Sequence, residues 1–196
     1  MTTRNQLRQS LREQRRSLPA ALHESCATRL ARQLGKHPLI RNSHHIACYL
    51  ANDGELDLLP LIVRLWTMGK ICYLPVLDGP HHDRLLFAPY HEGDALRVNR
   101  YGIPEPVLPR RYLSGGQALD LVLTPLVAFD MSGNRLGMGG GYYDRTFSFL
   151  RHRTHWHRPR LLGIAYELQK VATLECKDWD VPLHAVATEQ SVYLMK

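Results

Sequence analysis

Residues 121–145 read LVLTPLVAFDMSGNRLGMGGGYYDR and carry the strongest structural signal in the chain. An apolar run predicts a buried strand, a turn follows around Asp130 and Gly133, and four glycines then fall within positions 137–141. From Tyr142 the pattern predicts a helix. Glycine accepts positive φ and leaves the backbone N–H groups uncovered by a side chain. A strand, an open loop and a helix in this order are typical of an anion site in an α/β protein.

The segments on either side of this stretch alternate between helical and strand patterns. Residues 93–116 are rich in Gly and Pro, so we expect a loop there. The strand candidates are near-continuous apolar runs, which favour strands covered on both faces. The sequence therefore predicts one α/β domain over residues 1–196, a three-layer fold with a parallel or mixed central sheet covered by helices on both faces. Helices are expected at 2–18, 19–35, 56–68 and 142–150, and strands at 45–50, 71–77, 85–90 (an edge strand), 119–127, 161–165 and 185–193.

Composition excludes several classes of protein. The chain has 196 residues, of which 44% are hydrophobic and 22% charged, as in an ordinary globular domain. Its four cysteines are scattered without a Cys-x-x-Cys pair, which argues against a disulfide scaffold or a zinc ribbon and favours a reducing compartment. The first residues are too polar for a signal peptide, and no apolar run approaches the roughly 18 residues of a membrane span. We expect a cytoplasmic protein with no membrane partner.

The net charge of +7 is concentrated at the N-terminus. Residues 1–36 hold eight basic residues against two acidic ones, and residues 145–160 add five arginines and no acid. Such asymmetry suggests a polyanionic partner, either a nucleic acid or a small ligand with phosphates and carboxylates. A nucleic-acid surface needs aromatic residues among the basic ones, and the first cluster has none. Arg4, Arg8 and Arg12 recur every four residues, which suits either an anion site or a solvated helix face.

The glycine-rich loop fits no common phosphate fingerprint. A Walker A loop requires Gly-Lys-Ser/Thr, which is missing, and the third glycine of a dinucleotide fingerprint is replaced by Tyr142. Arg135 and Arg145 flank the loop, and Asp144 could hold a magnesium ion against phosphate oxygens. The plainer alternatives are a glycine-rich turn without a ligand and a capping acid at the start of a helix.

Several motifs together carry a more specific resemblance. Residues 135–145, with TPLVAFD at 124–130 and Gly133 before them, resemble the signature of the 5-formyltetrahydrofolate cyclo-ligase family, also called 5,10-methenyltetrahydrofolate synthetases. The resemblance continues in RNQLR at 4–8 and YLANDGELD at 49–57. It extends to YGIPEP at 101–106, and to Gln169, DVP at 180–182 and ATE at 187–189. These matches span nearly the full chain in the right order.

The resemblance implies a reaction and its partners. It implies ring closure of 5-formyltetrahydrofolate to 5,10-methenyltetrahydrofolate, dependent on ATP and Mg2+, with release of ADP and phosphate. The formyl oxygen is a poor leaving group, so the expected route phosphorylates it and passes through an iminium phosphate. The expected partners are these small molecules, with no nucleic acid, and we expect a monomer. The open alternative within enzymes is another kinase-like or ligase reaction at the same loop, which would leave Glu55 without a role.

By the resemblance, residue roles can be assigned position by position. Asp144 and Asp180 match magnesium-binding acids. The ATP-binding positions are Arg4, Arg8, Arg135, Leu136, Gly137, Met138, Gly139, Gly140, Gly141, Tyr142 and Tyr143. The folate-binding positions are Leu50, Glu55, Met138, Gly139, Gly140, Gly141 and Tyr142. The chain departs from the usual pattern at Arg4 (commonly Lys), Met138 (often aromatic or basic), Trp179 (frequently His) and His184 (commonly an acid).

Overall fold

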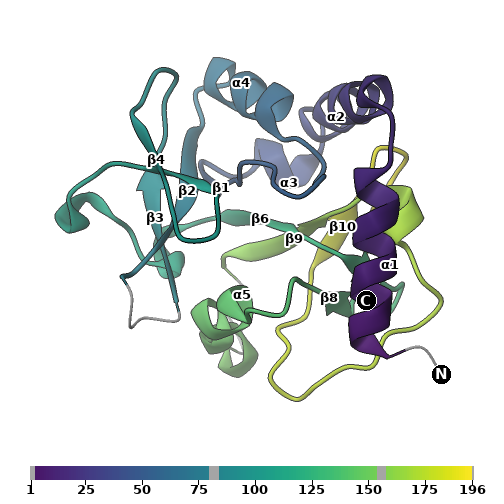
Figure 1. The fold of residues 1–196 in the computed structure, drawn as a ribbon. Coiled ribbons are helices and arrows are strands. Elements are labelled where there is room, and N and C mark those ends of the chain that lie inside the picture. Colours follow the sequence, from purple (N-terminus) through teal and green to yellow (C-terminus); the bar gives the residue numbers. More distant parts are fainter. Residues whose placement is uncertain (1–2, 80–83, 154–157, 196) are drawn as a thin grey trace.

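The computed structural model describes residues 3–79, 84–153 and 158–195 (Figure 1). Within these residues, the central sheet has seven strands in the order β11-β10-β9-β6-β1-β2-β3. The five inner strands run parallel, and β3 and β11 are antiparallel at the two edges. The strands are β1 (His45–Ala47), β2 (Ile71–Leu77), β3 (Leu85–Pro89), β6 (Leu121–Pro125), β9 (Arg160–Ile164), β10 (Ala185–Ala187) and β11 (Val192–Leu194).

The strand order creates a crevice at one end of the sheet. From β1 the chain first forms β2 on one side of it, and later returns to form β6 on the other side. Ile46 of β1 is therefore paired with Cys72 on one flank and Leu121 on the other. At such a switch point the connections leave the carboxyl ends of the two strands in opposite directions, and ligands of open α/β sheets bind in the space between them.

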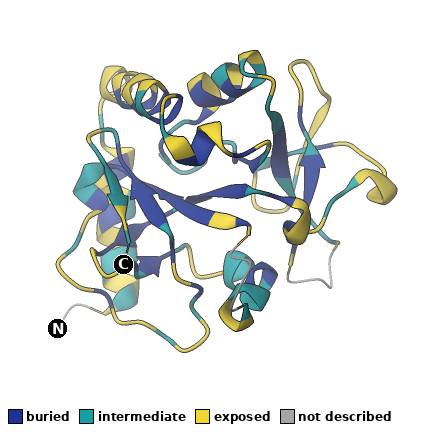
Figure 2. Cartoon of the chain, turned by 180° about the vertical axis from the view of Figure 1, so that it is seen from behind, coloured by how far each residue is buried: buried dark blue, intermediate teal, exposed yellow. Residues whose placement is uncertain are grey.

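Helices cover both faces of this sheet, which confirms the predicted three-layer fold (Figures 1 and 2). On one face lie α2 (Ala20–Leu34), α3 (Pro38–Arg41) and α4 (Leu59–Thr67). Their side chains share a fully buried cluster with the sheet, including Leu34, Ile40 and Leu65. On the other face, α5 (Tyr142–Thr146) and the 3-10 helix η3 (Ser148–His152) pack around Phe147.

Helix α1 (Arg4–Arg16) lies beside the segment that follows β6, where its Arg15 donates to the carbonyl of Leu126 at 3.2 Å. Thr3 and Gln6 cap its N-terminus reciprocally, which satisfies two backbone donors. Its buried Leu11 packs against the short hairpin of β7 (Ala128–Phe129) and β8 (Arg135–Leu136). The burial of Leu11 thus fixes which face of α1 is turned toward the β7–β8 hairpin.

Two sequence predictions are wrong in detail. The expected loop at 93–116 contains a hairpin of β4 (Leu96–Val98) and β5 (Pro104–Pro106), followed by 3-10 helices η1 (Arg110–Tyr112) and η2 (Gly116–Ala118). Prolines suit β5 because it lies at the edge of a two-stranded sheet. The single strand expected at 185–193 is instead β10, a turn and β11, with the reversal held by Thr188, whose Oγ1 accepts from the amides of Gln190 and Ser191.

The remaining boundaries shift by a few residues. The expected helix at 142–150 ends at Thr146 and continues as η3, and the expected strand at 119–127 narrows to β6. A further 3-10 helix, η4, spans Glu167–Gln169. Of the expected first helix, Thr2 lies outside the described residues. None of the helices in the described segments is long and apolar enough to span a membrane.

Candidate active site

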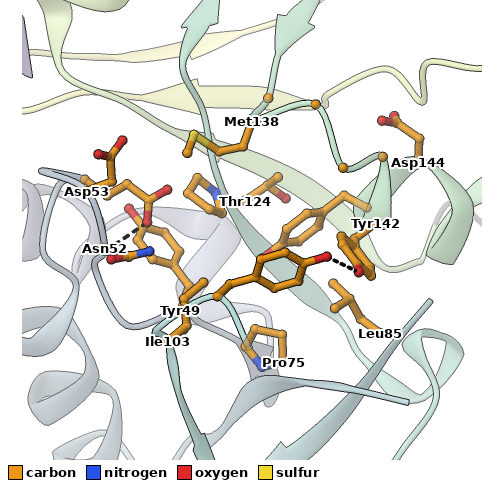
Figure 3. Close-up of a pocket in the computed structure, with 18 of the residues that line it drawn as sticks. Tyr49, Asn52, Asp53, Pro75, Leu85, Ile103, Thr124, Met138, Tyr142 and Asp144 are labelled. Atoms are coloured by element: carbon orange, nitrogen blue, oxygen red, sulfur yellow. Dashed lines mark hydrogen bonds between the residues drawn. The ribbon is translucent and has the colours of Figure 1, made fainter. Parts of the chain in front are cut away.

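A cavity of about 680 Å³ opens at the switch point of the sheet. Its walls come from the segment after β1, the end of β6, the glycine-rich loop, α1 and the β4–β5 hairpin. Figure 3 shows Asn52 and Asp53 on one side of it, Tyr142 and Asp144 on the other, and Met138 between them. Residues far apart in the sequence therefore share one concave site, which is where an α/β protein of this order binds its ligands.

The glycine-rich loop presents its backbone to this cavity. Gly139 has φ +102° and Gly141 has φ +65°, conformations that other residues rarely adopt. Within the described chain, the amide N–H groups of residues 137–141 have no hydrogen-bond acceptor in the protein. Met138, Gly139 and Gly140 are exposed. The loop is thus a row of unsatisfied donors at the mouth of the cavity, a pattern that suits an anionic ligand.

Two arginines of α1 lie beside this loop. Arg8 donates from Nε to the carbonyl oxygen of Gly137 at 2.9 Å. Arg4 donates from Nη1 to the carbonyl of Glu175 at 2.8 Å and lies 3.7 Å from Oδ2 of Asp180. Burial lowers the pKa of Arg8, and the neighbouring charge of Arg4 lowers it further. Two cations held so close together favour a multiply charged anion between them.

Arg135 lines the cavity, and its guanidinium is engaged by groups of the protein itself. Its guanidinium is buried and donates to the carbonyl of Val181 and to the carboxylate of Asp144. The amide of Val181 donates to the same Asp144 oxygen at 3.1 Å. Burial lowers the pKa of Arg135, although the charge of Asp144 opposes this. Arg135 therefore orients Asp144 at the wall of the cavity.

The two predicted metal ligands line the same cavity. Oδ2 of Asp180 accepts from the amide of Lys177 at 3.0 Å, and Asp144 is held by Arg135. No group of three or more metal-ligating side chains occurs among the described residues. Magnesium is commonly held by one or two carboxylates together with substrate phosphates and water. The donor set of Asp144 and Asp180 beside a phosphate-sized loop therefore fits a magnesium ion that arrives with a phosphorylated ligand.

The opposite wall carries an acid with an unusual environment. Glu55 has a side chain only 12% exposed, and its Oε2 accepts from the amide of Asn52 at 3.2 Å. Burial raises the pKa of Glu55 to about 7, while the nearby charge of Arg15 acts in the opposite direction. The hydroxyl of Tyr49 donates to the carbonyl of Leu56 at 2.7 Å and helps to hold this segment in place. A carboxylate here can accept two hydrogen bonds from a flat amino-substituted ring.

A tyrosine pair closes the cavity on the side of the β4–β5 hairpin. The Tyr101 and Tyr142 hydroxyls lie 2.9 Å apart, and the centroids of their rings, which meet edge to face, are 6.1 Å apart. Arg100 donates to the Tyr142 hydroxyl at 2.8 Å. The hydrogen bond with Tyr101 is the main cause of a lowered pKa at Tyr142. The β4–β5 hairpin, which lies in the Pro- and Gly-rich stretch expected to be a loop, thus supplies one wall of the site.

The hydroxyl of Thr124 is a buried polar group without a partner. Thr124 lies at the end of β6, is 2% exposed and lines the cavity. Its Oγ1 makes no hydrogen bond within the described protein. An unsatisfied buried hydroxyl costs about 1–3 kcal/mol, so a ligand that supplies the missing partner gains from it. The hydroxyl therefore adds a specific polar contact to the floor of the cavity.

The structure brings together nearly all of the predicted site residues. Of the positions assigned by resemblance to ATP, folate and magnesium, all except Leu136 line the cavity. Leu136 is 1% exposed and packs with Leu11 beneath α1, so it does not line this cavity, and its assignment to the ATP site stays a prediction. Trp179 lines the cavity and is 62% exposed. His184 does not line it; its Nδ1 accepts from the amide of Leu161 at 3.1 Å, next to the sheet.

Sequence reasoning missed residues whose role depends on tertiary contact. These residues carry no recognisable local pattern, with one exception: a spacing of 4, 8, 12 and 15 places four arginines on one side of α1. From that spacing, Arg15 could have been predicted to lie on the same side of α1 as Arg4, Arg8 and Arg12, which together form the arginine stripe. The missed cavity residues include Tyr49, Asp53, Leu74, Pro75, Leu85, Thr124 and Pro125.

The fold and cavity define an α/β enzyme with a glycine-rich loop at the switch point of its sheet. The family model described as the 5-formyltetrahydrofolate cyclo-ligase family matches residues 1–189. A 5-formyltetrahydrofolate cyclo-ligase of Escherichia coli K12 is 40% identical over 183 residues, covering 93% of this chain and 98% of the relative. The Haemophilus influenzae protein of the same name is 39% identical over 185 residues, covering 92% and 94%.

Solved structures agree with this assignment. The NMR structure of the 5,10-methenyltetrahydrofolate synthetase of Aquifex aeolicus superposes with a TM-score of 0.82 at 28% identity, covering 98% of this chain and 93% of that one. The chain belongs to the 5-formyltetrahydrofolate cyclo-ligase family.

Proposed function

We propose that this protein closes 5-formyltetrahydrofolate to 5,10-methenyltetrahydrofolate, using ATP with Mg2+ and releasing ADP and phosphate. Family membership supports the folate reaction, because the relatives are named for it. The observation that carries the ATP requirement is the row of unsatisfied amides at residues 137–141, flanked by Arg4 and Arg8. A triphosphate supplies acceptors for these donors and counter-charge for the arginines.

The chemistry explains why a phosphoryl donor is needed. The formyl oxygen attacks the γ-phosphorus, the bond from that phosphorus to the bridging oxygen breaks, and ADP leaves. The side-chain nitrogen of the folate then attacks the activated carbon, loses its proton, and closes the ring as phosphate departs with the former formyl oxygen. Neither step requires a covalent bond to the protein. The protein must align the oxygen with the phosphorus and stabilise the spreading negative charge.

The two walls of the cavity divide this work. The amides of residues 137–141 bind the phosphates, and Arg4 and Arg8 neutralise them. Magnesium held by Asp144 and Asp180 would supply positive charge to the transferring phosphoryl group. On the other wall, the Glu55 carboxylate accepts from the amino-pyrimidine edge of the pterin, and Tyr143 or Tyr142 packs against a ring. The formyl group then lies between the walls, within reach of the loop.

An assay of nucleotide turnover tests this proposal. Purified protein is mixed with ATP, Mg2+ and 5-formyltetrahydrofolate, and ADP and the absorbance of the methenyl product are followed together. We expect equal amounts of both products, and neither when the folate or the magnesium is omitted. ADP formation without folate would favour the other kinase-like or ligase reaction. Salt-sensitive binding of an oligonucleotide with no ADP formation would favour the nucleic-acid interpretation.

A further inference from the structure

The proposed function leaves a buried cation of α1 without a role. Arg15 is 0% exposed, although it belongs to the arginine stripe whose other members reach the cavity or the solvent. Burying a guanidinium is costly unless its donors are satisfied. Arg15 meets this requirement with a dense set of acceptors, all outside α1.

Through these acceptors, Arg15 connects segments that form two walls of the cavity. Arg15 donates from Nε to the carbonyl of Asp53 at 2.9 Å and from Nη2 to the Asp53 carboxylate at 2.9 Å. Its Nη1 donates to the carbonyl of Leu126, just after β6, at 3.2 Å. Its Nη2 also lies 3.8 Å from Oε1 of Glu55 and 3.9 Å from the sulfur of Met138. The side chain of Arg15 thus contacts the segment of Asp53 and Glu55, the residue that follows β6, and Met138 of the glycine-rich loop.

Asp53 is held in a conformation that needs such support. It is the one non-glycine residue of the described chain with positive φ, at +53°, and it is followed by Gly54 at φ +74°. A Cβ on Gly54 would lie 3.1 Å from Cα of Arg16, so the turn is pressed against the backbone of α1. Left-handed backbone costs about 1–2 kcal/mol for a residue with a side chain and persists where its surroundings hold it. Two residues after Asp53, this turn presents Glu55 to the cavity.

The charges around Asp53 act on Glu55 as well. Although burial by itself raises the pKa of Asp53, its hydrogen bonds from Arg12 and Arg15 outweigh this and lower it. At Glu55, Arg15 favours the charged carboxylate, whereas Asp53 disfavours it. The charged and titratable groups that act on Glu55 from the packed elements are Arg12 and Arg15 of α1, Asp53 of its own segment, Tyr49 after β1 and Tyr143 of α5.

We propose that Arg15 is a positioning residue which, by holding Asp53 in its turn, fixes the segment that carries Glu55 and so sets the folate subsite. The inference rests on the proposed function, in which Glu55 accepts from the pterin as a carboxylate. Arg15 itself does not touch the folate. It acts by placing Glu55 and by favouring the charged form of its carboxylate against the effect of burial.

Three variants test this role. Arg15→Met keeps the aliphatic stem but removes every donor, and Asp53→Asn keeps a residue that tolerates positive φ while removing its charge. Arg16→Met is the matched control: it is the next residue of α1, its side chain is 48% exposed, and its contact with Asp53 is longer, at 3.4 Å. Thermal melting establishes which variants are folded. If Arg15→Met does not fold, Asp53→Asn decides the question.

The expected results separate a positioning role from a purely structural one. Arg15→Met raises the KM for 5-formyltetrahydrofolate at least about tenfold and Asp53→Asn at least about threefold, with the KM for ATP changing less than about twofold. The acid limb of kcat/KM for folate moves up by about one pH unit in Arg15→Met, because Glu55 loses a favourable cation. It moves down in Asp53→Asn, because an opposing anion is lost. Arg16→Met keeps wild-type values.

A second readout does not depend on turnover. The pKa of the Glu55 carboxyl is measured by carbon NMR in protein labelled at glutamate, with the resonance assigned by Glu55→Gln. It rises in Arg15→Met and falls in Asp53→Asn. Folded variants with a wild-type KM for folate, or with both pKa changes absent or of the same sign, would overturn the positioning role. Failure of the proposed function is distinct, since the wild-type protein would then form no ADP with folate.

Discussion

Replacing Gly139 by alanine separates the backbone conformation of the loop from its packing. An added Cβ would meet only the guanidinium of Arg8, at 3.8 Å, which is an ordinary contact. The φ of +102° is the obstacle, since a residue with a side chain strongly disfavours it. The strain is about 1–2 kcal/mol. In Gly139→Ala the empty loop can move to a less strained conformation, but binding of ATP requires the strained one. The strain energy is therefore subtracted from ATP binding, and we expect the KM for ATP to rise about 5- to 30-fold.

The assay compares two glycines of similar conformation. Gly69, which follows α4, has φ +69° with nothing within 4 Å of an added Cβ, and it does not line the cavity. Steady-state kinetics and thermal melts are measured for Gly139→Ala and Gly69→Ala. We expect Gly69→Ala to lose stability with unchanged KM values, and Gly139→Ala to raise the KM for ATP with little loss of stability. An unchanged KM for ATP in Gly139→Ala would refute the role assigned to the loop amides.

Three further predictions concern the acids and the floor of the cavity. Asp144→Asn leaves the buried Arg135 without its counter-charge, so we expect the free energy of unfolding, measured with urea, to fall by about 1–3 kcal/mol. Because the variant also loses a proposed magnesium ligand, we expect turnover to fall at least about 100-fold. Turnover near the wild-type level would exclude the metal role. Thr124→Val removes an unsatisfied hydroxyl, so stability should stay the same or rise while the KM for folate increases; a lowered stability with unchanged KM would contradict this. Folding raises the pKa of Glu55 from 4.5 to about 7, so its stabilising contribution is complete below pH 4.5 and is lost as the pH rises through 7. Urea unfolding across this range should show a decline that Glu55→Gln removes, and an identical decline in the variant would contradict the assignment.

The central layers of the fold could be predicted because burial leaves a direct pattern in the sequence. Strand β6 is covered on both faces, and its first three residues, Leu121, Val122 and Leu123, are therefore a continuous buried apolar run. The β10–β11 reversal could not be predicted, because it uses the Thr188 hydroxyl rather than glycine or proline. The β4–β5 hairpin could not be predicted either, because both strands have only three residues and β5 contains two prolines, which are typical of turns.

The candidate site could be predicted to the extent that its chemistry is local. Glycines at 137–141 and the acid that follows them are neighbours in the sequence, and the family resemblance supplied the distant partners. The pairing of Arg135 with Asp144 was not foreseen, since the pattern suggested a free cation beside the loop. The hydrogen bonds from Arg15 to Asp53 join residues 38 positions apart and depend on how α1 packs. Such contacts appear only when the tertiary structure is known.

The most direct test of the central claim is a crystal structure of the protein with Mg2+ and a non-hydrolysable ATP analogue. The account predicts that several amide nitrogens of residues 137–141 lie about 2.7–3.2 Å from phosphate oxygens, with the γ-phosphate turned toward the wall that carries Glu55. A nucleotide bound elsewhere, or one that leaves these amides without a phosphate partner, would contradict it.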